Sequence, residues 1–334
     1  MRKYKNKLSN NIEEIYKNSV IRKSKIEDDI GLVRIDKYMG NRFSYYSRNK
    51  WQDLIGQGLV LLNGERIKYT REVKKGDEIT YHLIGLKEPE VDKNIQIVYD
   101  DGDLIIANKP ANLPVIPSGK YYYNTLHTII KDKFNCKINM LNRIDRETSG
   151  CVVLSRGNEV ASKFCKMLQS KNKKLIKKTY IALIENAQNI EASFTVEGYM
   201  EEVGHKDFRR YQILKKEKTE NSKYSKTKFK TLKKIGNEYA IVMCRLYTGR
   251  MHQIRVHLHS LGYYMIGDKV YGKYGPSVFQ DFIKKDKIPD GFFNRQALHS
   301  YKLEFNHPIT KEKIKVKAPL TKDLKELIKK LTNS

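Results

Sequence analysis

One short polar segment of the chain has the residue types that nucleophilic or acid–base chemistry requires. The segment Asn142 to Gly150 places a carboxylate, Asp145, between two arginines, Arg143 and Arg146. An ionised carboxylate can act as a nucleophile or a base, and a nearby guanidinium group stabilises its charge where water is excluded. On composition alone a simpler interpretation is favoured, in which Asp145 caps a turn and both arginines are solvated. Other parts of the chain must therefore decide between the two.

The elements around this segment are those of an α+β domain. Two helices are indicated by apolar residues at helical spacing, one running from Asn158 past Phe164 and one from Met251 to Gly262. Strands are indicated where β-branched and aromatic residues run together, and the polar segment lies directly before one of them. The expected strands are Ile95 to Val98, Leu104 to Asn108, Cys151 to Leu154, Thr179 to Ile184, Tyr239 to Leu246 and Leu303 to Phe305.

Five segments together resemble the pseudouridine synthases of the RluA family. The family's central motif is His-Arg-Leu-Asp followed by Thr-Ser-Gly, which here reads Asn142-Arg-Ile-Asp-Arg-Glu-Thr-Ser-Gly150. These segments span nearly all of residues 95–320 in the family's order. The other four are Val98-Tyr-Asp-Asp with Leu104 to Pro110, Lys178 to Leu183, Leu246 to His257 with Gly267-Asp268 and Tyr271-Gly272, and Arg295 to His299 with Phe305 and His307-Pro308.

The resemblance implies a reaction and a role for each matching residue. In the family the glycosidic bond of a uridine is broken, the uracil is turned, and its carbon five is joined to the ribose. By this match Asp145 is the catalytic carboxylate, Arg255 is its ion-pair partner, and Tyr180 lies on the uracil after it leaves the RNA stack. The residues expected to contact RNA in this domain are Arg143, Arg250, His252 and Gln253.

Two positions in the central motif depart from the family pattern. Asn142 stands where the family most often has His, and Ile144 where it usually has Leu. Asn can still form hydrogen bonds with backbone or base, and Ile conserves the volume of Leu. We therefore expect activity to be retained. By the match to the family, Arg143, which lies between these two positions, enters the space that the extruded base leaves.

A smaller unit precedes this domain. It has expected helices over Leu32 to Tyr46 and Arg48 to Ile55, the second capped by Ser47, and then a hairpin turn at Asn63-Gly64. This order resembles the small RNA-binding module named from ribosomal protein S-four. The cations expected to face an RNA backbone are Arg34, Lys37, Arg42, Arg48 and Lys50, although each would also suit a solvated helix surface.

These resemblances imply an α+β fold throughout. The catalytic domain is expected to contain a central mixed, mainly antiparallel β-sheet flanked by helices and loops, preceded by the small S-four-like α+β domain. The expected limits are a basic, loosely ordered tail over 1–28, the S-four-like domain over 31–86, a linker over 87–94 and the catalytic domain over 95–330.

The charge of the chain indicates a polyanionic partner. The 334 residues include 65 Lys and Arg against 38 Asp and Glu, a formal net charge of +27. Nucleic acid fits best, because Lys and Arg gain affinity by releasing counterions from phosphates. Much of the charge falls in Lys163 to Lys178 and in Lys206 to Lys234. The second stretch contains aromatic residues and predicts either a basic hairpin or loop along RNA or a solvated insertion.

Several other classes of protein are disfavoured. No run of about 18 apolar residues or secretion signal is seen, so a cytoplasmic protein without a membrane span is expected. The four cysteines lack paired spacing and are expected to be reduced thiols. On a helix, His252, His257 and His259 would not converge on one ion, and no phosphate-binding glycine loop is present. We expect no metal, no nucleotide and no other cofactor, and a monomer.

The sequence therefore predicts an RNA pseudouridine synthase, an intramolecular isomerase with RNA as its partner. Large-subunit ribosomal RNA is the expected substrate, because family members with the S-four-like module commonly act there, and transfer RNA is the alternative. A non-catalytic RNA-binding factor in ribosome assembly is a rival from another class. The joint presence of Asp145, Tyr180 and Arg255 argues against that rival, since binding alone does not need a buried charge pair.

Overall fold

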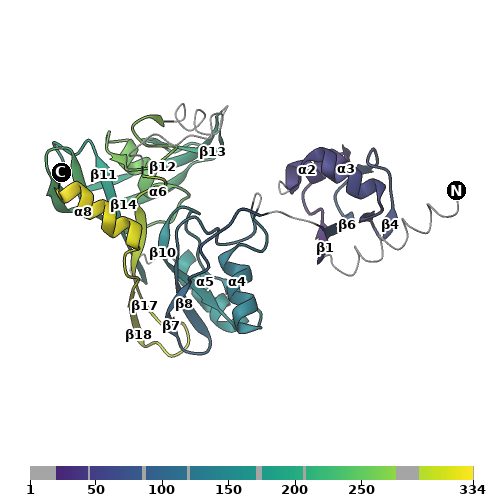
Figure 1. Ribbon diagram of the computed structural model, residues 1–334, viewed down its shortest axis with the longest axis horizontal. Helices are drawn as coiled ribbons and strands as arrows, with labels where there is room; N and C mark the ends of the chain where they lie inside the picture. Colours follow the sequence, from purple (N-terminus) through teal and green to yellow (C-terminus); the bar gives the residue numbers. More distant parts are fainter. Residues whose placement is uncertain are drawn as a thin grey trace. The chain divides into compact units, whose positions relative to one another are not determined.

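A computed structural model describes residues 20–43, 46–84, 88–118, 121–170, 175–205, 208–275 and 293–333 of the chain (Figure 1). The chain divides into two compact units. The N-terminal unit comprises Met1–Glu90 together with Ile116–Asn124, and the C-terminal unit comprises Val91–Val115 together with Thr125–Ser334. The segment Ile116–Asn124, predicted as part of the catalytic domain, thus belongs with the N-terminal unit.

The N-terminal unit packs two helices against a small antiparallel sheet. Trp51 lies at the centre of its core. The ring centroids of Tyr46 and Tyr81 lie 5.0 and 5.5 Å from that of Trp51. Ser47 accepts a hydrogen bond from the amide of Lys50 and so caps the second helix, as predicted. The elements are β1 (Val20–Lys25), β2 (Val33–Arg34), α2 (Ile35–Arg42), α3 (Arg48–Gly56), β3 (Val60–Leu62), β4 (Glu65–Arg66), β5 (Glu72–Val73) and β6 (Glu78–Leu83).

The predicted β3–β4 hairpin turn is present. Asn63 and Gly64 both have positive φ, at 51° and 86°, which is the backbone geometry of the two-residue turn that Asn-Gly favours. The amide side chain of Asn63 also donates to Asp77, and its oxygen accepts from the amide of Glu78. The turn is thereby bonded to the start of β6.

Two predictions for this unit are wrong in part. The loosely ordered tail predicted over 1–28 does not include residues 20–26, because β1 pairs with β6 along its whole length and Ile26 is buried; residues 1–19 lie outside the described part. The first helix begins at Ile35 rather than Leu32, because Val33 pairs with Val73 as a strand residue. Both errors arise from partners that lie far away in the sequence.

The C-terminal unit is built on one large sheet. Its strands lie in the order β13-β12-β14-β15-β11-β17-β10-β8-β7, and β16, β18 and β9 pair with β11, β17 and β10. The pairings between described strands are antiparallel except that of β10 with β17, so the predicted mixed, mainly antiparallel sheet is confirmed. The strands are β7 (Gln96–Asp100), β8 (Leu104–Lys109), β9 (Asn139–Met140), β10 (Ser149–Ser155), β11 (Ile176–Glu185), β12 (Ser193–His205), β13 (Phe208–Lys215), β14 (Lys223–Ile235), β15 (Tyr239–Leu246), β16 (Tyr264–Met265), β17 (Leu298–Asn306) and β18 (Lys313–Lys317).

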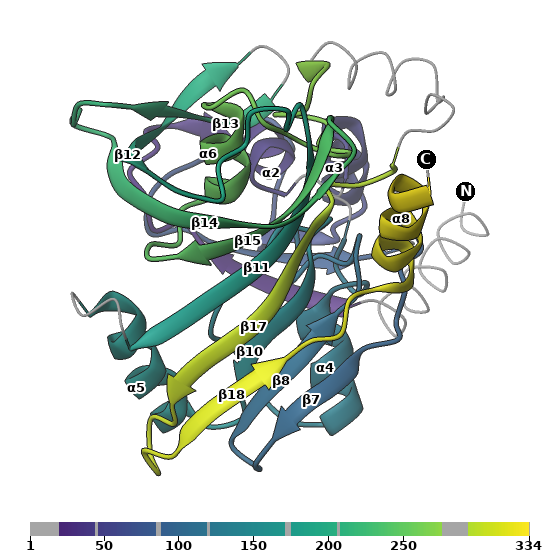
Figure 2. The ribbon, with the colours of Figure 1, turned by 90° about the vertical axis from the view of Figure 1, so that its left-hand side faces the viewer.

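Helices cover both faces of this sheet. The helices of the unit are α4 (Leu126–Phe134), α5 (Asn158–Gln169), α6 (Gln253–His259) and α8 (Lys322–Asn333). α8 lies on one side of the sheet and α4 and α5 on the other (Figures 1 and 2). α6 packs Ile254 and Leu258 on the same cluster as Tyr180, whereas α8 packs Leu324 against Ile181, the next residue of β11. Successive residues of β11 therefore face opposite layers.

A glycine in the central motif allows the parallel strand pair to form. Gly150, the second residue of β10, lies beside Ser300 of β17 and has a φ of +107°. A Cβ atom at this position would collide with the carbonyl oxygen of Ser300, closer than any side chain tolerates. A glycine is thus needed at the end of the Thr-Ser-Gly sequence, where the motif enters the sheet.

The basic stretch from Lys206 to Lys234 is not a hairpin of its own. β12 lies between β13 and β14 and pairs with both, so the stretch contributes two separated strands to the main sheet. Composition does not reveal this arrangement, because the pairing partner, Ser193–His205, is not basic.

A buried carboxylate provides a test of the N-terminal unit. Asp36 is fully buried and accepts hydrogen bonds from Arg34, Arg48 and Gln52. Burial alone would raise its pKa, but these three donors hold the pKa below its ordinary value. The stability that they provide is therefore present above pH ~4 and is lost as the pH falls below it.

We expect Asp36→Ala to reduce the free energy of unfolding of this unit by about 2 kcal/mol, because three donors lose their acceptor. Denaturant unfolding of the full chain at neutral pH, followed by the fluorescence of Trp51, measures the loss. Lys37→Ala is the control, since Lys37 is exposed and has no ion pair among the described residues. Equal midpoints for the two variants would contradict the role of Asp36.

Candidate active site

The turn that carries Asp145 is held by the strands on either side. Asn142 accepts a hydrogen bond from the amide of Val153 through its side-chain oxygen, at 2.7 Å. The amide of Thr148 donates to the carbonyl of Asp145 at 3.1 Å, which closes the turn. Asn142 thus forms the backbone hydrogen bond that was expected of it in place of His.

A buried lysine, Lys109, forms a hydrogen bond with the same turn. Lys109 ends β8 and is fully buried. Its ammonium donates to the carbonyls of Pro110, Leu113 and Arg146 at 2.8, 2.7 and 3.0 Å. Burial holds the pKa of Lys109 well below its ordinary value, with Arg295 adding to the effect. Lys109 therefore ties the loop after β8 to the residue that follows Asp145.

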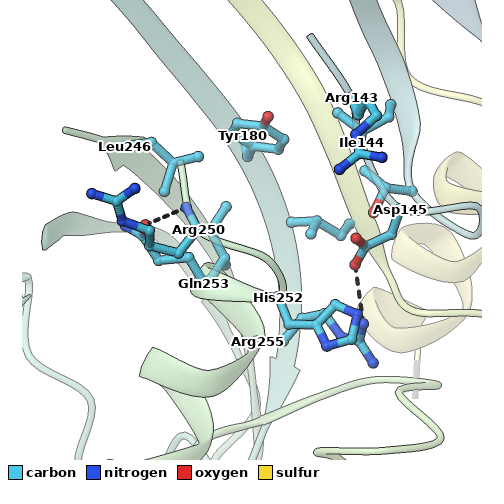
Figure 3. A pocket seen from close by; sticks show the side chains of 12 residues that line it. Arg143, Ile144, Asp145, Tyr180, Leu246, Arg250, His252, Gln253 and Arg255 are labelled. Atoms are coloured by element: carbon cyan, nitrogen blue, oxygen red, sulfur yellow. Dashed lines mark hydrogen bonds and ion pairs between the residues drawn. The ribbon is translucent and has the colours of Figure 1, made fainter. Parts of the chain in front are cut away.

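Arg255 of α6 joins two carboxylates. Its Nη1 atom donates to Oδ2 of Asp145 at 3.0 Å (Figure 3). Its Nε and Nη2 atoms donate to Asp268 at 2.6 and 2.8 Å. Asp268 is fully buried and also accepts from the amides of Val270 and Tyr271. Arg255 is thus fixed by Asp268 on one side and presents its remaining donor to Asp145.

The surroundings of Asp145 favour its charged form. Burial would raise the pKa of its carboxyl, but the charges of His252 and Arg255 and hydrogen bonds from Gln296 and Arg255 lower it below the ordinary value of 3.8. The side chain of Asp145 remains 28% exposed, whereas that of Arg255 is 7% exposed. A carboxylate that is both ionised and accessible can reach a ligand.

Besides Asp268, two residues that contact the Asp145–Arg255 ion pair were not predicted as site residues. Gln296, just before β17, donates through Nε2 to Oδ2 of Asp145 at 3.1 Å and also to the hydroxyl of Thr148. Tyr271 lies under Arg255, with its ring centre 5.0 Å from the guanidinium carbon. Both fall in segments that match the family's motifs. Their roles went unseen because contacts between distant segments leave no trace in spacing.

The pocket opens beside Asp145 and reaches Tyr180 of β11. Asp145 and Arg255 lie on one side of it and Leu246 and Arg250 on the other (Figure 3). Tyr180 is 7% exposed, and burial raises the pKa of its hydroxyl to about 12. The phenol is therefore protonated at neutral pH and can donate a proton but cannot start as a base. The pocket is lined by Arg143, Ile144, Asp145, Thr148, Tyr180, Leu246, Arg250, His252, Gln253, Ile254, Arg255 and Leu298.

The four residues predicted to contact RNA in this domain all line the pocket, in different environments. Arg143 and Arg250 are exposed, and Arg250 donates from Nε to the carbonyl of Tyr224. His252 precedes α6 with φ of 58°, and its Nδ1 atom lies 3.2 Å from the hydroxyl of Tyr271. Gln253 is buried and uses both atoms of its amide inside the protein, which indicates a structural role.

The predicted cations of the N-terminal unit also differ in their surroundings. Arg34 and Arg48 form ion pairs with the buried carboxylate of Asp36 at 3.1 and 2.9 Å, so they stabilise the unit itself. They remain 42% and 50% exposed. Lys37 and Lys50 are exposed on α2 and α3.

The histidines that resemble a metal cluster have separate surroundings. The ring of His257 lies 2.8 Å from the hydroxyl of Ser225, and His259 lies 3.0 Å from the carbonyl of Tyr271. Within the described ranges, no group of His, Cys, Asp or Glu side chains has the arrangement of a metal site. No helix in that part of the chain is long and apolar enough to cross a membrane.

Comparisons with known proteins place this fold and site in one class. Residues 103–260 match the family described as RNA pseudouridylate synthase, and residues 33–79 match the S4 domain. An uncharacterised RNA pseudouridine synthase of Helicobacter pylori J99 is 32% identical over 89% of this chain and 90% of its own. Two human RNA pseudouridylate synthase domain-containing proteins, numbered 4 and 1, share the fold with TM-scores of 0.54. They are 20% and 22% identical and cover 70% and 74% of this chain and 92% and 98% of their own.

The class is therefore that of the RNA pseudouridine synthases, enzymes that isomerise uridine in RNA. Within this class, the chain belongs to the RluA family, with an S4 domain before its catalytic domain. The predicted family, fold class and enzymatic activity are confirmed.

From the charge of Arg255 we predict how the reaction rate depends on pH. In Arg255→Gln, the guanidinium no longer opposes the effect of burial on Asp145, so the pKa of the carboxyl rises. As the pH is lowered, the rate of this variant therefore begins to fall at a higher pH than that of the wild type. The pH dependence of the single-turnover rate measures this shift. Arg255→Lys retains the charge and should shift the profile less. A folded Gln variant with the wild-type profile would contradict this assignment.

Gln296 is predicted to position Asp145 without touching RNA, because its side chain is buried. We expect Gln296→Leu to lower kcat about tenfold with KM unchanged, from the loss of one hydrogen bond to a charged group. Gln296→Glu should instead move the acid limb of the pH profile upward, since it places a second carboxyl beside Asp145. A change in KM alone would argue against positioning.

Proposed function

We propose that this enzyme converts uridine to pseudouridine in large-subunit ribosomal RNA, with Asp145 as the catalytic carboxylate. The observation that carries the proposal is the ion pair of Asp145 with Arg255 at the base of an open pocket. A carboxylate held as an anion, yet 28% exposed, is suited to attack or proton abstraction and poorly suited to a purely structural role.

The reaction requires one bond to be exchanged for another. The bond from N1 of uracil to C1′ of ribose breaks, a bond from C5 to C1′ forms, the proton on C5 leaves, and N1 gains a proton. Asp145 serves as the nucleophile or base of this sequence. Tyr180, protonated at neutral pH, stacks on the base and is placed to donate a proton.

The target uridine must leave its RNA helix or loop to reach Asp145. Unstacking costs a few kcal/mol, which contacts in the pocket offset. The exposed Arg143 lies two residues before Asp145 and lines the pocket, so it is suited to fill the space that the base leaves. Arg250, on the other side, is suited to hold the phosphate backbone.

The choice of substrate is supported by named relatives. The ribosomal large subunit pseudouridine synthases D of Nitrosomonas europaea and Xylella fastidiosa are 26% and 27% identical, each over 92% of this chain and 87% and 91% of their own. The S4 domain and the charge of +27 suit a large, structured RNA.

Mapping pseudouridine in total RNA from cells with and without the gene tests the substrate. We expect a mark to disappear from large-subunit ribosomal RNA and to return with the wild-type gene. Loss of marks from transfer RNA alone would contradict the ribosomal assignment. No lost mark in any RNA would contradict the enzymatic proposal itself.

The same cells test the role of Asp145. We expect Asp145→Ala to restore no mark, because removing the reacting group of an enzyme typically lowers the rate about 10⁴-fold or more. Asp53→Ala, at an exposed carboxylate of α3, is the control and should restore the mark fully. Restoration by Asp145→Ala at the wild-type level would refute the assignment.

A further inference from the structure

A row of cations crosses the face of the catalytic sheet that the pocket does not use. Lys228 of β14 pairs with Arg245 of β15, and Arg245 pairs with Thr179 of β11. Thr179 pairs in turn with Lys302 of β17, and Lys302 with Lys317 of β18. Residues directly opposite each other on paired strands share a face of the sheet. The row therefore spans five strands, about 19 Å at the usual strand spacing.

A second row lies two residues further along the same strands. Lys177 of β11 pairs with Glu304 of β17, and Glu304 pairs with Lys315 of β18. Because side chains on one strand alternate between faces, these residues lie on the same side as the first row. We call the combined surface the cation face; it consists of Lys177, Lys228, Arg245, Lys302, Lys315 and Lys317.

The cation face lies on the opposite side of the sheet from Tyr180. Thr179 belongs to the first row, so its neighbour Tyr180 points the other way and lies among the residues packed with α6. Ile181 and Met243 continue the cation side of their strands and contact the apolar cluster of α8. α8 covers one part of this side and leaves β18 and much of β17 in view (Figure 2). Lys302, Lys315 and Lys317 of the cation face belong to these two strands.

The charge of this surface is largely unbalanced within the protein. Glu304 is the one carboxylate paired with these six cations in the strand register of the described residues, and it forms an ion pair with Lys302 at 2.5 Å. Six cations and one carboxylate leave a net charge of +5. Lys228, Lys315 and Lys317 are exposed, and the described residues place no carboxylate within ion-pair distance of them. Like charges side by side on a sheet are destabilising unless an anion binds.

The aromatic residues here indicate which part of an RNA fits. The guanidinium of Arg245 lies 5.2 Å from the ring centre of Tyr247, and the ammonium of Lys317 lies 5.8 Å from that of Tyr301. Sheets that bind single strands stack bases on open aromatic rings. Here cations lie against the rings, so the surface offers charge rather than stacking. It is suited to phosphates on the outside of a double helix.

We propose that the cation face binds the phosphate backbone of a double-helical segment of the substrate RNA, separate from the segment that enters the pocket. The proposal rests on the proposed function only in taking RNA as the ligand. Phosphate contacts made away from the target uridine would add affinity without reading sequence.

The test compares two triple variants of the full chain. Lys228→Gln, Lys315→Gln and Lys317→Gln together remove three exposed charges from the cation face. Lys131→Gln, Lys133→Gln and Lys137→Gln remove three exposed charges in and just after α4, on the other side of the sheet. The probe is a fluorescein-labelled RNA duplex of about 20 base pairs, titrated by fluorescence anisotropy over a range of salt concentrations. A single strand of the same length is titrated alongside.

We expect the first triple variant to lower the slope of log affinity against log salt by about 2 to 3 for the duplex. The control should keep the wild-type slope, and kcat at saturating RNA should be unchanged in both. An unchanged slope in the first variant, an equal loss in the control, or a loss confined to the single strand would overturn the proposal. Because the titration needs no isomerisation, its result stands apart from that of the proposed function.

Discussion

The site depends on one guanidinium that two carboxylates share. Arg255 is buried, and Asp268 binds two of its donor atoms while accepting two backbone amides. Burial opposes the charge on Arg255, yet Asp268 and Asp145 keep its pKa above the ordinary value. Asp268 thus fixes the cation so that its third donor stabilises Asp145 as an anion at the edge of water. Removing any member would leave a charge buried without its partner, which is far costlier than never burying the pair.

The large sheet exists, in functional terms, to bring these groups together. Asp145 precedes β10, Gln296 precedes β17, and the parallel pairing of those two strands at Gly150 places the amide of Gln296 against the carboxylate. Arg255 lies on α6, 110 residues after Asp145 in the sequence, and donates a hydrogen bond to the same carboxylate. The same sheet separates the pocket from the cation face, since Tyr180 faces the pocket and its neighbour Thr179 lies on the other side.

Much of this was predictable from sequence, for identifiable reasons. Ser47 as a cap and Asn63-Gly64 as a turn follow from local chemistry, and the strand Tyr239–Leu246 follows from local composition. Asp145, Tyr180 and Arg255, which were assigned from the resemblance to the family's motifs, line one pocket. The features that were not predicted depend on contacts between distant segments. β1 pairs with β6, which lies more than fifty residues later in the chain. Gln296 donates its hydrogen bond to Asp145, which lies 151 residues earlier. Register and contact between distant segments leave no local signal.

The central claim is that the Asp145 carboxylate carries out the isomerisation. The most direct measurement is tritium release from large-subunit ribosomal RNA labelled at C5 of uridine, in a single turnover with purified Asp145→Asn. This variant keeps the size and shape of the side chain and removes its charge. We predict stoichiometric release by the wild type and none by the variant, although both bind the RNA equally. Release by the variant at the wild-type rate would contradict the account.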